Sequence, residues 1–113
     1  MSDDCLFCKI VRGEIPARIV DQTGDAIAFR DITPQAPVHL LVIPKRHVAS
    51  LAAASDEVEL GRLMTFAARV AVAEGIAESG YRAVINTSDD GGQTVHHLHV
   101  HILGGRRMTW PPG

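Results

Sequence analysis

The sequence predicts an α+β fold built on an antiparallel sheet. Its apolar patterns follow the order helix, strands, long helix, strands along the 113 residues. The connections are short and show no alternation of strand and crossover helix, which disfavours a parallel sheet. One hydrophobic core is ordinary for this length, so we expect a single domain over residues 1–113.

The N-terminal segment predicts a short helix followed by two short strands. The apolar residues of segment 4–12 fall on one side of a helix, and Gly13 suits its C-terminal end. Extended segments follow at 19–20 and 26–29, around a turn at 23–25.

The middle of the chain predicts a loop, a central strand and a long helix. Two prolines make residues 31–38 a loop, because each lacks an N–H donor and restricts its neighbour. The apolar run 39–43 is typical of a buried strand. Residues 56–78 predict an amphipathic helix, with N-cap candidates at 55–56 and an end before Gly80.

The C-terminal third predicts two strands joined by a polar loop. Residues 81–87 alternate between side-chain types, residues 88–94 are rich in Gly and Asp, and residues 95–103 alternate again. Residues 110–113, with the sequence Trp-Pro-Pro-Gly, predict an irregular tail.

Composition and charge exclude several classes of protein. The formal net charge is −2, so we expect no basic field that would bind nucleic acid. No apolar run approaches the ~18 residues of a membrane span. The acidic start lacks the layout of a signal peptide, and we therefore expect a cytoplasmic protein with neither a membrane nor a nucleic-acid partner.

The segment 95–103 holds three histidines in alternation with apolar residues. As a strand it projects His97, His99 and His101 from one face and leaves the apolar side chains for the core. Same-face neighbours lie ~7 Å apart, so all three cannot share one metal ion without a bend. One imidazole can attack phosphorus or a carbonyl while a second passes a proton to the leaving group. This spacing indicates that two histidines act together and the third acts separately.

A polar loop before this segment indicates an anion site. Gly91 and Gly92 allow backbone N–H groups to approach an anion, while Gln93 and Thr94 add side-chain donors. Asn86, at the end of the preceding strand, is a further donor. A tight Gly-Gly turn is the alternative, and the loop lacks the lysine of a P-loop. The neighbouring histidines favour a phosphate cradle.

Cys5 and Cys8 are the only cysteines and form a C-x-x-C pair. On a helical turn, residues i and i+3 face the same way and suit two of the four positions around zinc. Free buried thiols and a thioredoxin-like redox pair are the alternatives, although the strand expected before a redox pair is absent from the pattern. In a reducing compartment a metal site is favoured over a structural disulfide.

The run H-L-H-V-H-I-L resembles the His-φ-His-φ-His-φ-φ signature of the histidine triad (HIT) superfamily, in which φ is an apolar residue. The resemblance extends over nearly the whole chain. Its further motifs are Phe7-x-Lys9-Ile10, Gly13-Glu14-Ile15-Pro16-Ala17, the run from Ala28 to Pro37, Val42-Ile43-Pro44-Lys45-x-His47 and Gly91-Gly92-Gln93. The ending, from Gly104 to Gly113, resembles the Hint branch of purine nucleoside phosphoramidases.

The resemblance implies a hydrolase that cleaves the P–N bond of purine nucleoside 5′-phosphoramidates and acts on related nucleotides, adenosine phosphoramidate and aminoacyl-adenylates among them. His99 would be the nucleophile and form a nucleotidyl-histidine intermediate. His101 would orient the phosphate and assist the leaving amine, with His39 as its supporting partner. Three alternatives remain open: a dinucleoside polyphosphate hydrolase, which the Hint-like tail disfavours, a nucleotide-binding regulator with incidental activity, and a metallohydrolase with the triad as ligands.

The resemblance also implies a nucleotide site. Asn86, Gln93 and Thr94 would hold the α-phosphate, and Asp31 would accept hydrogen bonds from the ribose hydroxyls. Apolar residues would form the slot for the purine: Leu6, Phe7, Ile10, Phe29, Ile32 and Leu41. From the residues alone, ordinary core packing is the alternative for this slot, and a turn position is the alternative for Asp31. His96 stands where the Hint pattern usually has tyrosine, and we expect it to be structural or partly exposed.

For the cysteine pair, the resemblance implies a structural zinc ion held by Cys5, Cys8, His47 and His97, and no organic cofactor. It further implies a five-stranded antiparallel sheet with a short N-terminal helix and one long helix. Two such sheets would join in a homodimer through the long helix and an edge strand. The tail with Trp110 would reach towards the partner's site.

Overall fold

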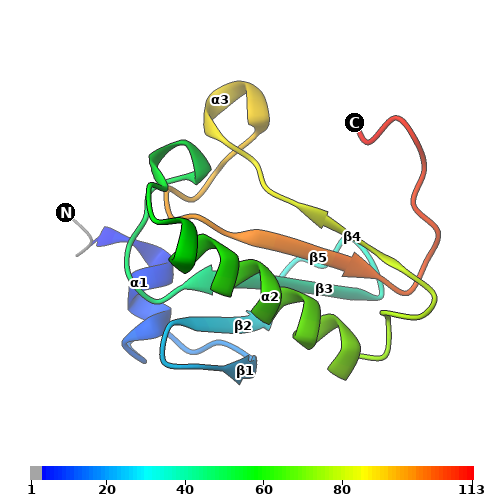
Figure 1. Cartoon of the computed structure of the whole chain (residues 1–113), viewed down its shortest axis with the longest axis horizontal. Coiled ribbons are helices and arrows are strands. Elements are labelled where there is room, and N and C mark those ends of the chain that lie inside the picture. Colours follow the sequence, from blue (N-terminus) through cyan, green and yellow to red (C-terminus); the bar gives the residue numbers. More distant parts are fainter. Residues whose placement is uncertain (1–3) are drawn as a thin grey trace.

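The structure is a computed structural model that describes residues 4–113 (Figure 1). Its centre is one antiparallel sheet with the strand order β1-β2-β3-β5-β4. The strands are β1 (Ile19–Gln22), β2 (Ala26–Arg30), β3 (Val38–Pro44), β4 (Tyr81–Val84) and β5 (Val100–Gly104). The helices are α1 (Leu6–Val11), α2 (Glu57–Ala73) and the single-turn α3 (Ser88–Gly91), with a 3-10 turn, η2, at Leu51–Ala53. The predicted fold class, a five-stranded antiparallel α+β sheet with a short N-terminal and one long helix, is confirmed.

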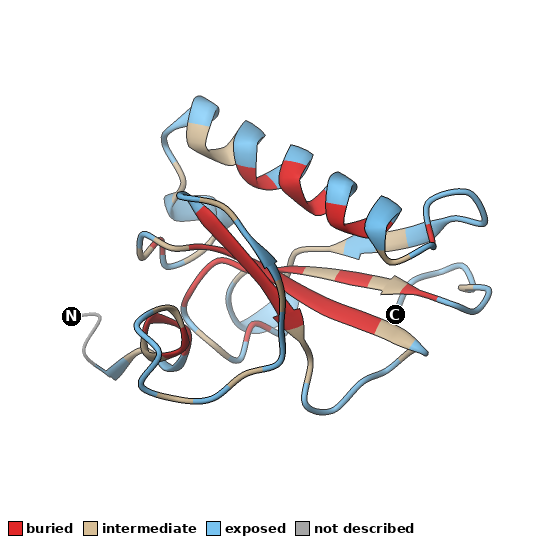
Figure 2. Ribbon diagram, turned by 90° about the horizontal axis from the view of Figure 1, so that it is seen from below, coloured by how far each residue is buried: buried red, intermediate tan, exposed pale blue. Residues whose placement is uncertain are grey.

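The helices cover the two faces of the sheet unequally (Figure 2). On one face α2 packs along the sheet, and alternate residues of β3, Leu40 and Val42, join Phe66 of α2 in the larger core. On the other face Leu41 joins Phe7 of α1 in a smaller apolar cluster. Each large apolar side chain buried in this way contributes about 1.5–3 kcal/mol relative to an exposed one. Because α1 is short, it covers only part of this second face.

Capping residues explain where the helices begin and end. The Sγ atom of Cys5 accepts a hydrogen bond from a backbone N–H in the first turn of α1. Asp56 caps α2 through two backbone N–H groups, as its position predicts. The predicted end of this helix at residue 78 is wrong. It ends at Ala73 because Gly75 adopts a left-handed conformation, with φ +77°, that closes the last turn.

The histidine segment is less regular than predicted. We expected a strand over residues 95–103, but β5 is shorter, and of the alternating histidines only His101 lies in it. The segment departs from the sheet before Val100, which pairs with Val42, although β3 itself continues to Pro44. Before β5, the Leu98 N–H donates instead to the carbonyl of Val48, in the loop that follows β3. The positions of the other two histidines therefore depend on side-chain contacts and loop hydrogen bonds.

Two neighbouring boundaries also differ from prediction. The strand predicted over residues 81–87 ends at Val84, because the adjacent strand β5 starts close to the residue opposite, His101. The loop predicted over residues 88–94 contains α3, a single turn that Gly92 caps with φ +79°.

The acidic start on which we based the absence of a signal peptide includes residues 1–3, which lie outside the described residues. Between residues 4 and 113, no helix has the length and apolar character needed to cross a membrane.

Candidate active site

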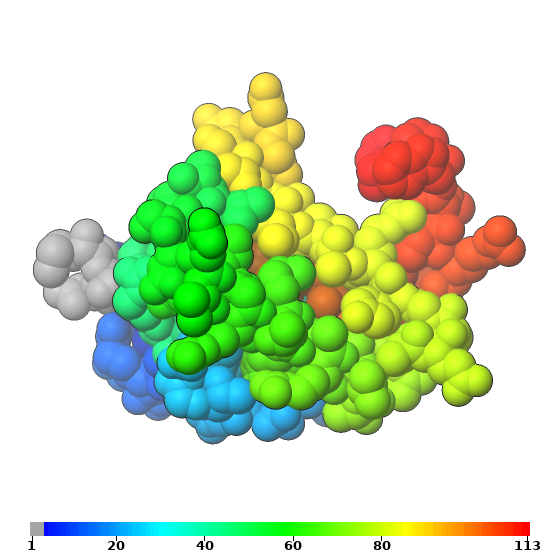
Figure 3. All heavy atoms as spheres, viewed as in Figure 1, coloured from blue at the N-terminus to red at the C-terminus, as the bar shows by residue number. Residues whose placement is uncertain are grey.

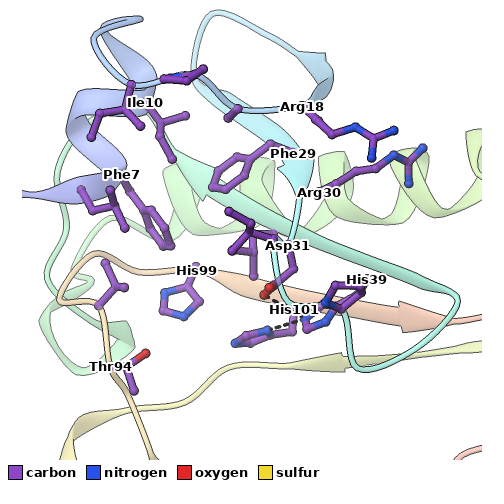
Figure 4. A pocket seen from close by; sticks show the side chains of 18 of the residues that line it. Phe7, Ile10, Arg18, Phe29, Arg30, Asp31, His39, Thr94, His99 and His101 are labelled. Atoms are coloured by element: carbon purple, nitrogen blue, oxygen red, sulfur yellow. Dashed lines mark hydrogen bonds and ion pairs between the residues drawn. The ribbon is translucent and has the colours of Figure 1, made fainter.

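A cavity of about 820 Å³ opens on the sheet face opposite α2 (Figure 4). It is bordered by α1, by β2 and β3, and by the segment that leads into β5. Most of the predicted site residues line it: Leu6, Phe7, Ile10, Phe29, Asp31, Ile32, His39, Leu41, Thr94, His99 and His101. The structure thus brings the predicted purine slot and the predicted catalytic histidines to one cavity.

Two central strands place His39 and His101 next to each other. Side chains alternate along β3, so His39 and Leu41 line the cavity while Leu40 enters the core against α2. Across the sheet, Leu41 pairs in register with His101 of β5. The Nε2 atom of His39 lies 2.9 Å from the Nδ1 atom of His101 (Figure 4). We refer to Asp31, His39 and His101 as the His/Asp cluster.

Hydrogen bonds determine the neutral tautomers in the His/Asp cluster. The Gln35 backbone N–H donates to Nδ1 of His39 at 3.0 Å, so this nitrogen carries no proton. The proton of neutral His39 is therefore on Nε2, which donates to Nδ1 of His101 and lies 3.4 Å from Oδ2 of Asp31. Because His101 accepts through Nδ1, its own proton is on Nε2. His101 thus offers an N–H donor to the cavity.

Burial keeps these imidazoles uncharged at neutral pH. Desolvation, together with the nearby His99 and His39 rings, lowers the pKa of His101 to about 4, although the charge of Asp31 opposes this shift. Desolvation also lowers the pKa of His39, again against the charge of Asp31. At neutral pH, His39 and His101 therefore contribute an N–H hydrogen-bond donor to the cavity and not a positive charge.

His99 has the complementary hydrogen-bonding state. Its Nδ1 atom lies 2.7 Å from the His97 carbonyl oxygen, which can only accept, so Nδ1 carries the proton and Nε2 holds a lone pair. The ring is buried and lies edge-to-face with Phe7 and His101, at centroid distances of 5.2 Å and 5.0 Å. A lone pair and an N–H donor on adjacent rings suit attack on an electrophile beside a hydrogen-bonded leaving group.

Four predicted nucleotide-binding residues lie outside the cavity lining: Asn86, Gly92, Gln93 and Trp110. The Gln93 side chain is buried and bonds three backbone groups, and so it shapes the loop that brings Thr94 to the cavity. Trp110 is 81% exposed, in a C-terminal tail that stands away from the sheet (Figures 1 and 3). His96 is exposed, as expected.

Sequence reasoning missed one backbone contact and several lining residues, namely the segment 15–18, Arg30, Pro34, Pro37 and Val95. The residue that orients His39 is Gln35, but it does so through its backbone N–H, which leaves no signal in the side-chain pattern. The segment 15–18 lines the cavity on the side of Phe29. Its Ile-Pro-Ala run was part of a recognised motif, but we assigned it no role in the site.

The predicted metal ligands also come together. We refer to Cys5, Cys8, His47 and His97 as the Cys/His cluster, and their ligand atoms lie within 4.8 Å of one another. Nδ1 of His97 is 3.3 Å from the sulfur of Cys5 and 3.5 Å from that of Cys8, and Nδ1 of His47 is 3.4 Å from the latter. Nε2 of His97 donates to the Pro44 carbonyl at 2.8 Å, which leaves the Nδ1 lone pair facing the sulfurs. These four residues can hold a metal ion.

Comparison with known proteins gives a consistent result. A family model described as HIT domain matches residues 12–108. An uncharacterised HIT-like protein from Synechococcus elongatus is 55% identical over 100% of both chains. The purine nucleoside phosphoramidase of Escherichia coli is 50% identical over 96% of this chain and 92% of that protein. A solved structure, a HIT family hydrolase from Legionella pneumophila, superposes with a TM-score of 0.95 at 53% identity, over 97% of this chain and 100% of that one.

Proposed function

The chain belongs to the HIT family and is a hydrolase of that family, and from this premise we propose that it cleaves the P–N bond of purine nucleoside 5′-phosphoramidates such as adenosine phosphoramidate. The name of the Escherichia coli relative supports this substrate class. The observation that carries the proposal is the pair of adjacent rings in the cavity, one with a lone pair on His99 and one with an N–H donor on His101.

In the first step, Nε2 of His99 attacks phosphorus and the P–N bond breaks. The electron pair of that bond leaves with the nitrogen. Nε2–H of His101 holds the leaving group, and water supplies the proton with which the amine departs. The His99 ring, already protonated at Nδ1, becomes the cationic half of a nucleotidyl-histidine, and the His97 carbonyl stabilises this charge.

In the second step, the hydroxide that remains attacks phosphorus and displaces the ring of His99. The product is a nucleoside monophosphate, and His99 regains its lone pair. Across both steps one water molecule is consumed and one amine is released, so atoms and charge balance. His39 takes no part in bond making; its Nε2–H keeps Nδ1 of His101 occupied and so keeps the donor on the cavity side.

The rest of the cavity suits a nucleotide in one orientation. The apolar walls from α1, β2 and β3 form a slot for the purine, and Ile32, 98% exposed at the rim, is covered when the base binds. Asp31 accepts hydrogen bonds from the ribose hydroxyls. Thr94 holds the α-phosphate through its hydroxyl, with Asn86 as a further donor and Gln93 as the support of the loop. The predicted backbone donors of the Gly92 turn are already used, because the N–H groups of Gly92 and Gln93 donate to the carbonyls of Asp89 and Ser88.

The Cys/His cluster is proposed to hold a structural zinc ion, and no organic cofactor is involved. Two thiolates and two imidazoles are a common ligand set for structural zinc. A tetrahedral zinc ion with bonds of about 2.3 Å to sulfur and about 2.05 Å to nitrogen would place each sulfur about 3.6 Å from each nitrogen. The S···N distances of 3.3, 3.4 and 3.5 Å come close to this value before any adjustment.

We also propose a homodimer. In the sheet of residues 4–113, β4 is an edge strand, and α2 leaves Val58 and Val72 exposed by 62% and 65%. An apolar helix face and an unpaired strand edge favour continuation of the sheet into a second copy of the chain. The tail with Trp110 then reaches the partner's cavity. A solution mass of one 12.2 kDa chain would contradict this proposal.

The activity is tested with a fluorogenic adenosine 5′-phosphoramidate. We expect steady turnover by the natural protein and no measurable turnover by His99→Ala, because the variant has no nucleophile. A tenfold preference for diadenosine polyphosphates would assign the other hydrolase activity instead. Binding of nucleotides without hydrolysis of either substrate would leave a regulatory function. Loss of activity on chelation, with the fold and nucleotide binding intact, would favour a metallohydrolase.

A further inference from the structure

His97 connects the Cys/His cluster to the cavity. Its ring has no exposed surface and is held at both nitrogens, by the sulfur atoms on one side and by the Pro44 carbonyl on the other. Its backbone carbonyl accepts the Nδ1–H of His99 at 2.7 Å. One residue therefore contributes a ring to the cluster and a carbonyl that determines the tautomer and direction of the proposed nucleophile.

Two sets of contacts hold this carbonyl in place. The His97 carbonyl shares a peptide plane with the Leu98 N–H, which donates to the Val48 carbonyl at 2.6 Å. On the other side of the backbone, the His97 ring is anchored at both nitrogens. Because the segment before β5 pairs with no strand of the described chain, the ring contacts and this backbone hydrogen bond together decide where the carbonyl points.

Phe7 makes a second connection between the two regions. Phe7 lies in α1, between the N-cap residue Cys5 and Cys8 in the sequence, and its buried ring lines the cavity. Its centroid lies 5.9 Å from that of His97 and 5.2 Å from that of His99, both in edge-to-face geometry. A shift of the first turn of α1 therefore moves a wall of the cavity against the ring of His99.

We infer that the Cys/His cluster is a positioning device for the active site: by clamping His97 and the start of α1, its bound ion orients His99 and closes the purine slot. Loss of the ion then lowers nucleotide affinity and turnover in protein that is still folded. The part of this inference that concerns turnover rests on the proposed function, whereas the part that concerns nucleotide affinity and ring orientation does not.

The variant that tests it is His47→Asn. His47 contacts Cys8 and His97 and does not line the cavity, so its substitution weakens ion binding without removing a group from the active site. We expect the Kd of AMP, measured by calorimetry, to rise about tenfold and kcat to fall about 10- to 100-fold. The matched control is His96→Asn, an exposed histidine beside His97, for which both constants should be unchanged.

A second readout reports orientation directly. Ring ¹⁵N spectra of the natural protein should show His99 protonated at Nδ1, and the zinc-free protein should show a mixture of tautomers that re-addition of zinc reverses. Circular dichroism at the same temperature identifies protein that is folded. If His47→Asn does not fold, the same measurements are made on the natural protein before and after chelation.

Zinc-free, folded protein with an unchanged Kd for AMP and an unchanged His99 spectrum would overturn the inference and leave the cluster with a purely stabilising role. Absence of phosphoramidate turnover in the zinc-loaded natural protein would instead contradict the proposed function. In that case AMP binding and the ring spectra would still decide whether the cluster positions His99.

Discussion

The Cys/His cluster and the His/Asp cluster assemble similar residue types at similar separations, but their hydrogen bonds differ. In both, the possible ligand atoms lie within 4.8 Å of one another. The far nitrogen of His97 meets a backbone carbonyl, so the nitrogen that faces the cluster holds a lone pair. The far nitrogen of His39 meets a backbone N–H, so the nitrogen that faces the cluster carries a proton. Distance alone therefore does not identify a metal site.

The difference shows that the backbone behind an imidazole decides its chemistry. A carbonyl behind the ring prepares a metal ligand, and an N–H behind the ring prepares a proton donor. His99 follows the first pattern but has no cysteine beside it; its carbonyl partner prepares a lone pair for attack on phosphorus. The following predictions test this division, beginning with the largest expected effect.

The zinc content of the protein should depend on the Cys/His cluster and not on the His/Asp cluster. Cys8→Ser should lower bound zinc from about one equivalent to less than about a quarter, and lower the free energy of unfolding by about 4 kcal/mol or more, because structural zinc contributes folding energy directly. His39→Ala should retain the full equivalent, as measured by elemental analysis of protein purified without chelators. Loss of zinc from His39→Ala, or retention in Cys8→Ser, would contradict the division.

Turnover should depend strongly on the N–H donor that His101 supplies in the His/Asp cluster. His101→Ala should lower kcat for the phosphoramidate about 10²- to 10³-fold, since it removes a preorganised N–H donor at the leaving group, while zinc content stays unchanged. His96→Ala, an exposed histidine of the same segment, serves as the control. A kcat within about threefold of the natural value would show that His101 is not the donor.

Stability should fall in mild acid because of the His/Asp cluster. The pKa of His101 is about 4 in the folded protein and ordinary, near 6.5, in the unfolded chain. Between these values the unfolded chain binds more protons, so the free energy of unfolding falls as pH falls. Since His101 is only partly buried, we expect a loss of about 1 to 2 kcal/mol between about pH 7 and pH 5, measured by urea unfolding of zinc-loaded protein.

The same experiment on His101→Gln isolates this contribution. Glutamine does not titrate, so the slope between the two pH values should become shallower. Some slope should persist because the pKa of His39 is lowered in the same direction and because the zinc ligands take up protons when unfolding releases the ion. An unchanged slope in the variant would mean that His101 does not carry the effect.

The smallest effect is expected at Asp31. Asp31→Asn keeps the Oδ1 atom that accepts from the Thr33 N–H but removes the charge beside His39. We expect KM to rise about fivefold, or about 1 kcal/mol, through weaker bonds to the ribose, with zinc content unchanged. Asp21→Asn, on the exposed edge strand β1, is the matched control, and an equal rise in both variants would remove Asp31 from the ribose site.

Much of the fold follows from local patterns, and the error in the histidine segment occurs where distant segments meet. The turn at residues 23–25 and the cap at Asp56 are local and were predicted correctly. Before β5 starts, the Leu98 N–H donates to the Val48 carbonyl of a distant loop instead of to a strand, and no periodicity in residues 95–103 records this contact. The apolar pattern of α2 continues past its end, because Ile76 is buried even though Gly75 has already closed the helix.

The candidate site divides in the same way. Alternation selected His97, His99 and His101, and the C-x-x-C spacing selected Cys5 and Cys8, whereas His39 and His47 were assigned from the resemblance to the HIT superfamily. These signals were not sufficient to find Gln35, which acts through its backbone, or to place Gln93, which supports the loop instead of lining the cavity.

The sequence by itself determined which chemical groups are available and which of them share a face, because side-chain alternation is a local property of an extended backbone. Only the tertiary structure decided what each imidazole does. The carbonyl of Pro44 behind His97 and the N–H of Gln35 behind His39 come from other parts of the fold. A hydrogen bond depends on the distance and angle between two atoms in space, so the tautomers that separate metal ligand, nucleophile and donor exist only once the chain has folded.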